Sequence, residues 1–194
     1  MLSFFIQAFE FLFRSVFDIA IFNFISRFIF QMARVNFYNP FSQLLLKVTD
    51  PLLAPARRYI PSIRSIDTAC LMIIVMLTFL KLIVLSWIKY QQTPHIPGLL
   101  LWTMGDLSTA ILYFFFFAVL AQTVIGWMAN SHLHPLNSLL DQITKPLIRP
   151  VRRWLKPIGG FDLTALPVMM GLQFFIILFA APLTQMGQAL ALHP

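Results

Sequence analysis

The sequence has little charge and almost no cysteine. Only 11% of its 194 residues are charged, against about 25% in an ordinary soluble domain, and 59% are hydrophobic. This composition argues against a soluble globular domain and is typical of an integral membrane protein. The single cysteine, Cys70, excludes an intrachain disulfide, and in its apolar surroundings it is expected to pack as a small hydrophobic residue.

Acidic residues are also scarce. Seven Asp and Glu stand against fourteen Lys and Arg, which gives a formal net charge of +7. In a soluble protein this excess would suggest nucleic acid as a partner. Here the cations lie beside long apolar runs, so an anionic lipid surface is the simpler partner, and no direct contact with nucleic acid is expected.

Local catalytic signatures are missing too. The sequence has no Gly-x-Ser-x-Gly, no Gly-rich phosphate loop and no His-Glu-x-x-His. His132 and His134 resemble a metal-binding pair, but no acidic residue lies close to them except Asp141. We therefore expect no metal, no cofactor and no enzymatic activity.

What the chain does contain is an internal repeat. Residues 39–58 return 95 positions later as residues 134–153. Because repeats dictate architecture, we predict two tandem units, residues 1–95 (repeat 1) and 96–194 (repeat 2). The matching positions of repeat 1 are Asn39, Pro40, Pro51, Pro55, Arg57, Arg58 and Asp67, and those of repeat 2 are His134, Pro135, Pro146, Pro150, Arg152, Arg153 and Asp162.

Four apolar runs flank the repeated segments. Runs near 20 residues match the roughly 30 Å hydrocarbon core at about 1.5 Å per helical residue, and a backbone in lipid must satisfy its own polar groups. We predict an all-α membrane protein with four transmembrane helices, the third of which is either lengthened or preceded by a re-entrant piece at residues 98–105. The runs are 16–33, 68–88, 107–128 and 163–183.

Each repeated segment is predicted to form a helix in the membrane plane and then a bend. Asn39 before Pro40 is a helix-start signal, and about ten residues with one apolar face follow, too few to cross a membrane. Pro51 is expected to end this helix and Pro55 to break or kink the next turn, because proline lacks the N–H donor. Both units thus consist of a span, an in-plane amphipathic helix, a proline-broken basic elbow and a second span.

The distribution of cations predicts the orientation. Both repeated segments are rich in Lys and Arg, whereas the hairpin between the second and third spans holds only Lys89. The positive-inside rule places both elbows in the cytoplasm, most simply at a bacterial inner membrane. The two units then have parallel topology.

Residues 39–67 and 134–162 resemble the signature of the YggT family, also called YlmG-like. The fingerprint is Asn-Pro-Phe, a short amphipathic stretch, Pro-Leu-hydrophobic-x-Pro-x-Arg-Arg, a further proline and an aspartate that opens the next span. Repeat 2 departs from it at His134 and Leu136. The resemblance implies a non-enzymatic membrane protein, with suggested roles in osmotic stress tolerance, cell division or assembly of membrane complexes.

The arginine pairs Arg57–Arg58 and Arg152–Arg153 are the best candidates for binding. Arginine binds phosphate in a bidentate way, so these pairs would hold anionic lipid head groups or an acidic protein partner. The alternative is that they only set topology. Membrane-protein partners and a homo-oligomer remain open.

Ionisable residues inside apolar runs form the second group of candidates. Such residues are functional candidates by default because unpaired charge in hydrocarbon is costly. Asp18 and Arg27 lie nine residues apart and need separate partners, and Arg14 can pair with Asp18. Gln122 is the repeat equivalent of Arg27, so both are predicted to line one pseudo-symmetric seam. Lys81 is the remaining candidate in this group. For all of these residues, the alternative is that they only pair between helices or extend toward the membrane surface.

Two functions follow. The first is a structural or organising protein at the inner membrane surface. The rival is a transporter or channel component, because transporters also combine internal repeats with intramembrane charges. The depth of residues 51–61 and 146–157 distinguishes them: a polar cavity there that contains Arg27 and Lys81 would favour transport.

Overall fold

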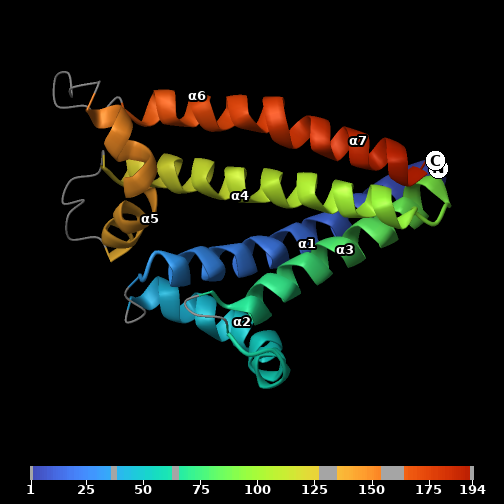
Figure 1. Cartoon of the computed structure of the whole chain (residues 1–194), viewed down its shortest axis with the longest axis horizontal. Coiled ribbons are helices and arrows are strands. Elements are labelled where there is room, and N and C mark those ends of the chain that lie inside the picture. The colour runs from blue at the N-terminus through green and yellow to red at the C-terminus, as the bar shows by residue number, and fades with distance from the viewer. Residues whose placement is uncertain (1, 36–38, 63–65, 127–134, 154–163, 193–194) are drawn as a thin grey trace.

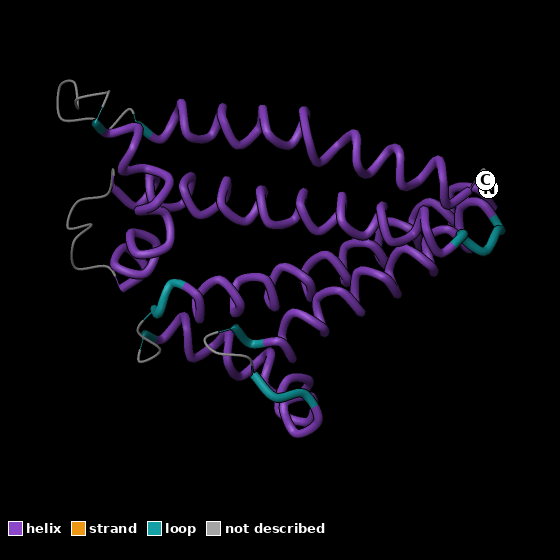
Figure 2. Tube along the Cα trace, in the orientation of Figure 1, coloured by secondary structure: helices purple, strands orange, loops and turns teal. Residues whose placement is uncertain are grey.

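The computed structural model describes residues 2–35, 39–62, 66–126, 135–153 and 164–192. Helices and short connections build these ranges, which hold no β-strand (Figures 1 and 2). The all-α prediction is confirmed. The elements are α1 (Leu2–Met32), α2 (Pro40–Tyr59), α3 (Thr68–Tyr90), α4 (Ile96–Gly126), α5 (Pro135–Arg152), α6 (Ala165–Phe175), a π-helical turn η2 (Ile176–Ala180) and α7 (Ala181–Leu192).

Three helical stretches in the described ranges are long and apolar enough to cross a membrane: Thr68–Tyr90, Ile96–Gly126 and Ala165–Leu192. The helix α1 has 31 residues but is not among the three. Residues 98–105 extend the third predicted span, since α4 begins at Ile96. The last stretch is α6, η2 and α7 in sequence, and the π turn arises where the Ala181 N–H reaches back five residues to the Ile176 carbonyl.

The long helices run beside one another, and the shorter α2 and α5 lie at one end of them (Figure 1). The chain termini and the connection from α3 to α4 lie at the opposite end. The two copies of the repeated segment therefore occupy the same end of the molecule.

The prediction that proline ends the in-plane helix is wrong. The helix α2 continues through Pro51 and Pro55, and α5 continues through Pro146 and Pro150. Their later turns still point in a new direction: in Figure 1 the end of α2 is seen end-on. Because the prolines lie on the exposed side, the carbonyls that lose an N–H partner face outward, which explains why a bend is tolerated here without a break.

Close backbone contact holds α4 against α7. A Cβ atom added to Gly98 would lie 2.1 Å from the Ala191 nitrogen, and one added to Gly187 would lie 2.2 Å from the Trp102 nitrogen. Small residues at such crossings let helices approach closely and pack by van der Waals contact, which is one of the forces that associate helices in lipid. Repeat 2 therefore has a tightly joined helix pair.

Candidate functional site

Lys81 joins three helices by ion pairs. Its side chain on α3 is 3% exposed, and its Nζ lies 2.8 Å from Asp18 Oδ1 on α1 and 2.5 Å from Asp106 Oδ2 on α4. Asp18 also lies 3.6 Å from Arg14 on its own helix, as predicted for that pair. Because α1 and α3 belong to repeat 1 and α4 to repeat 2, the Lys81 ammonium links the two repeats.

A polar cleft of about 150 Å³ opens beside Lys81. Its walls come from α1, α3, α4 and α7, and it extends from Lys81 toward the end where the termini lie. Glu10 and Lys89 face each other in it at 4.0 Å, and Gln188 donates to the Tyr90 hydroxyl at 2.6 Å. The cleft thus contains cations and carboxylates in mutual contact, with Arg14 and Asp106 completing its ionisable lining.

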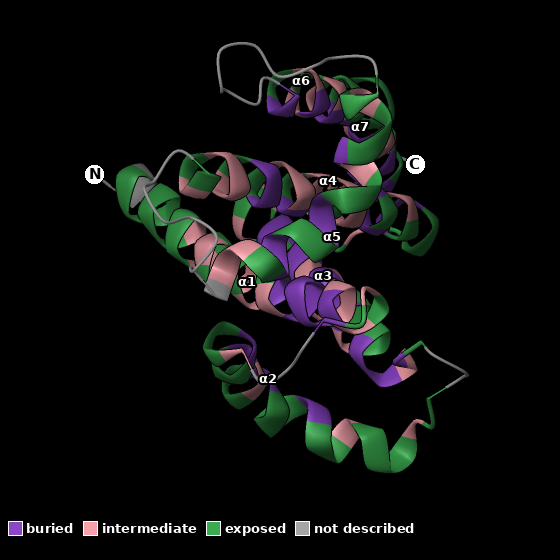
Figure 3. Cartoon of the chain, turned by 90° about the vertical axis from the view of Figure 1, so that its left-hand side faces the viewer, coloured by how far each residue is buried: buried purple, intermediate pink, exposed green. Residues whose placement is uncertain are grey.

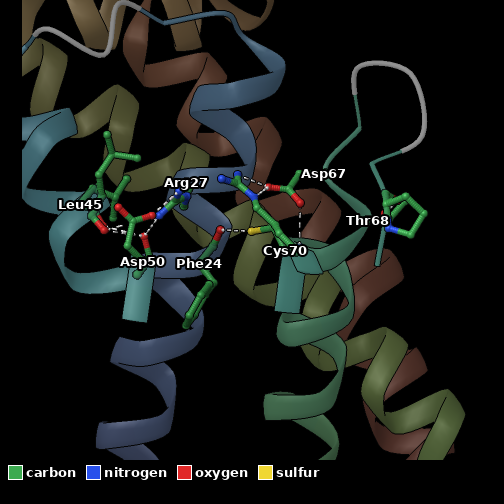
Figure 4. Close-up of polar contacts among 11 residues, drawn as sticks. Phe24, Arg27, Leu45, Asp50, Asp67, Thr68 and Cys70 are labelled. Atoms are coloured by element: carbon green, nitrogen blue, oxygen red, sulfur yellow. Dashed lines mark hydrogen bonds and ion pairs between the residues drawn. The ribbon is translucent and has the colours of Figure 1, made fainter. Parts of the chain in front are cut away.

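Arg27 is buried at the junction of α1 and α2. Its side chain is 4% exposed; one guanidinium nitrogen donates to Thr49 Oγ1 at 2.5 Å, and the other lies 2.7 Å from Asp50 Oδ1 (Figure 4). Thr49 in turn donates to the Leu45 carbonyl one turn earlier. The arginine therefore attaches α2 to α1, and as predicted its partners differ from those of Asp18.

Repeat 2 has a similar contact in which a neutral glutamine takes the place of the arginine, and the glutamine amide also lies 3.4 Å from Asp141 Oδ1. The single hydroxyl proton of Thr144 on α5 is shared between two acceptors, the side-chain oxygen of Gln122 on α4 and the Leu140 carbonyl at 2.8 Å. Thr144 lies 95 positions after Thr49, and Gln122 lies 95 after Arg27. The two residues therefore occupy equivalent junctions, one in each repeat, and not one shared seam.

Arg57 forms an ion pair with a buried carboxylate, although its own side chain is 44% exposed. Its guanidinium lies 2.5 Å from Asp67 Oδ2, and the Asp67 side chain is only 2% exposed (Figure 4). The other Asp67 oxygen accepts from the Cys70 N–H at 3.1 Å, so Asp67 caps α3 as its place before the span predicts. Asn39 likewise caps α2 by accepting from the Phe41 N–H. The first arginine of the pair thus connects the end of α2 to the start of α3.

Exposed cations gather on α2, α5 and their flanks. Arg58, Arg149, Arg152 and Arg153 are all exposed, at the end of the molecule that holds both helices. Asp162, His132 and His134 lie outside the described residues. Among the residues that the structure describes, no group of three His, Cys, Asp or Glu is placed to hold a metal ion.

Three residues that take part in these contacts were missed by the sequence analysis. Asp106 was overlooked because the third span was taken to begin at Leu107, although the possible extension through residues 98–105 would have placed it inside a helix. Thr49 and Thr144 were overlooked because an uncharged hydroxyl residue is not a functional candidate by itself. Their spacing of 95, equal to that of Arg27 and Gln122, was the available signal.

Comparison with known proteins identifies related sequences. The family model described as CCB3/YggT matches twice, at residues 6–88 and 101–183, again 95 positions apart. A Vibrio alginolyticus protein, "Uncharacterized protein in proC 3'region", is 35% identical over 170 residues, covering 87% of this chain and 91% of its own. "Uncharacterized protein YggT" of Escherichia coli K12 is 35% identical over 140 residues, covering 72% and 70%.

A third relative, an uncharacterized protein of Pseudomonas aeruginosa PAO1, is 31% identical over 158 residues, or 79% of this chain and 80% of its own. No solved structure matches the chain. The double match of the family model agrees with the two repeats found in the sequence.

Proposed function

The chain belongs to the CCB3/YggT family, and from that premise we propose that it is a non-enzymatic integral membrane protein that organises lipids or partner proteins at one membrane surface. In this proposal α1 is the fourth span, and α2 and α5 lie at the cytoplasmic surface of a bacterial inner membrane. Such a platform would serve osmotic stress tolerance, cell division or assembly of a membrane complex.

The observation that carries the proposal is the gathering of exposed arginines at one end. Arg58 of repeat 1 and Arg149, Arg152 and Arg153 of repeat 2 are exposed there, although the copies are 95 residues apart in sequence. Each cation is worth about 1 kcal/mol near an anionic leaflet. The combined attraction favours lipid phosphate or an acidic protein surface, and arginine suits either because its planar fork binds two oxygens at once.

Within each arginine pair of the motif, the second member is the better candidate for this contact. Both Arg57 and Arg58 are exposed, but the Arg57 guanidinium is already engaged with Asp67, whereas Arg58 is adjacent to Tyr59, which is 87% exposed. The test therefore targets Arg58 and Arg153.

The experiment measures lipid enrichment around the purified protein. The chain is placed in nanodiscs of phosphatidylglycerol and phosphatidylcholine, and the lipids retained on gentle extraction are quantified. Arg58→Gln with Arg153→Gln should lower phosphatidylglycerol retention about fivefold for each arginine that contacts a phosphate, from about 1 kcal/mol each. Lys89→Gln, at the opposite end, is the matched control.

Two further readouts separate the alternatives. If the double variant keeps its lipid profile and only its orientation changes, the arginines set topology and the platform proposal fails. In-cell photocrosslinking from position 58 or 153 identifies an acidic protein partner, and position 53 on the same helix serves as the control because Leu53 is 0% exposed.

A transporter or channel component is the second candidate, favoured by Lys81 between two aspartates beside a polar cleft. Against it, the described residues that line the cleft include none from α2 or α5, and Arg27 is not among them. Solute flux in reconstituted vesicles that is lost in both Arg27→Ala and Lys81→Ala would favour transport over the platform.

A further inference from the structure

The two repeats contact each other through different faces. The ring of Phe22 on α1 contacts that of Phe114 on α4, with centroids 5.6 Å apart. If a two-fold relation joined the repeats, the equivalent residues, Ile19 and Phe117, would make the same contact. Instead, Ile19 is 63% exposed and Phe117 is 52% exposed. The contact between the repeats is therefore head-to-tail, which leaves one unused face on each repeat.

The unused face of repeat 1 comprises Ile19 of α1 and one side of α2. Leu139 and Ile143 on α5 are each 2% exposed and belong to the core cluster that contains Ile21 and Ile25 of α1. Their equivalents on α2, Leu44 and Val48, are 66% and 55% exposed. Figure 3 shows α2 as a largely exposed helix. The same helix face is thus covered in one repeat and uncovered in the other.

The unused face of repeat 2 lies on α4. Ile25 of α1 is 2% exposed, whereas its equivalent, Leu120, is 38% exposed. Ile29 packs against the core cluster, and its equivalent, Val124, is 47% exposed. With Phe117, these residues repeat on α4 the apolar surface that α1 uses to receive repeat 2. Each chain therefore carries two complementary faces, one on each repeat, that do not meet within the same molecule.

We propose that a second copy of this chain completes it. The face formed by Ile19, Leu44 and Val48 of one copy packs on the face formed by Phe117, Leu120 and Val124 of the other. Head-to-tail contacts close into a ring when the rotation between neighbouring units allows it. Two copies of the chain would form a ring of four repeats, in which the two contacts between chains are identical. The proposal is supported by the chain itself, because the equivalents of these faces already pack against each other between its own repeats.

This dimer goes beyond the proposed surface function and does not depend on it. Packing of apolar and aromatic side chains is a recognised source of helix association in lipid. The competing occupant is lipid acyl chain, which would cover both faces without specificity. The two occupants differ in whether positions 19 and 117 of different molecules meet.

Crosslinking of single-cysteine variants tests that meeting. In a Cys70→Ala background, Ile19→Cys protein is mixed with Phe117→Cys protein, reconstituted together and treated with a short bismaleimide. A covalent dimer is expected in the mixture and not in either variant alone. Ile177→Cys with Phe117→Cys is the control, because Ile177 is equally exposed at 63% but belongs to neither face. No crosslink in the test mixture, or a crosslink of Ile19→Cys with itself, overturns the proposal.

Dissociation of the dimer provides the second test. Leu44→Asn with Val48→Asn should raise the dimer dissociation constant in nanodiscs or detergent at least tenfold, measured by energy transfer between labelled copies. Met76→Asn is the matched control, an exposed apolar residue (69%) outside both faces. Both test positions are exposed, so the helical content should not change. A monomeric wild-type chain, or an unchanged constant in the double variant, refutes the interface.

Discussion

Replacing Lys81 with methionine removes a buried ammonium and leaves its two carboxylates behind. Asp106 is 19% exposed and lies 2.5 Å from Nζ, so its charge becomes buried without compensation, a loss of about 3–5 kcal/mol in comparable cases. Asp18 is 47% exposed and still has Arg14 at 3.6 Å, so the loss of its ion pair with Lys81 should contribute less than about 1 kcal/mol to the destabilisation. We expect Lys81→Met to lower the free energy of unfolding by about 3–4 kcal/mol.

The assay is reversible unfolding in mixed micelles, followed by circular dichroism. The double variant Lys81→Met, Asp106→Leu should recover most of the loss, because removing both members of a buried pair is often neutral. Lys89→Met is the control: Lys89 is half exposed, lies 4.0 Å from Glu10, and should contribute less than about 1 kcal/mol. A loss below about 1 kcal/mol in Lys81→Met, or a double variant as unstable as the single one, would refute the reasoning.

Three other substitutions have defined outcomes. Arg27→Gln should lower the free energy of unfolding by less than about 1 kcal/mol and Arg27→Ala by about 2–3 kcal/mol, because glutamine at position 122 already serves the equivalent junction. Equal losses for the two variants in the unfolding assay would contradict this. Asp67→Ala removes a helix cap and an ion pair. It should lower the free energy of unfolding by about 2–3 kcal/mol, and with it the midpoint of thermal unfolding. Gly187→Val forces two backbones apart and should abolish the folded yield, whereas Gly171→Ala meets open space and should leave the yield unchanged or raised.

The repeat predicted more of this structure than the hydropathy did. Matching prolines and arginines indicated that the copies would share one end of the molecule, and the spacing of 95 also relates Thr49 to Thr144. Hydropathy alone gave four spans, of which three are found in the part of the chain that the structure describes, and it placed Asp106 outside them because a charged residue was taken as a boundary. A carboxylate can lie inside a span when an ammonium on the next helix neutralises it, and a single sequence does not reveal such pairs.

Two features could not be obtained from the sequence. Proline at position 51 normally ends a helix, but its exposed side allows the unpaired carbonyl to face outward, and exposure is a tertiary property. The manner in which the repeats pack was also hidden. Internal similarity shows that two units are equivalent, yet it does not distinguish a two-fold from a head-to-tail arrangement, which depends on the exposure of Ile19 and Phe117.

The glycine contact between α4 and α7 has a counterpart that sets the stiffness of the two halves. Gly105 lies so close to Thr184 that an added Cβ would be 2.5 Å from the threonine nitrogen. The positions 95 residues earlier hold Glu10 and Lys89, whose long side chains meet only at 4.0 Å. At this place the two helices of repeat 2 are in direct backbone contact, whereas those of repeat 1 carry a partly exposed pair of opposite charges. We therefore expect α1 and α3 to move more than α4 and α7 at this end of the molecule. Spectroscopic probes of mobility are best placed on α1 and α3.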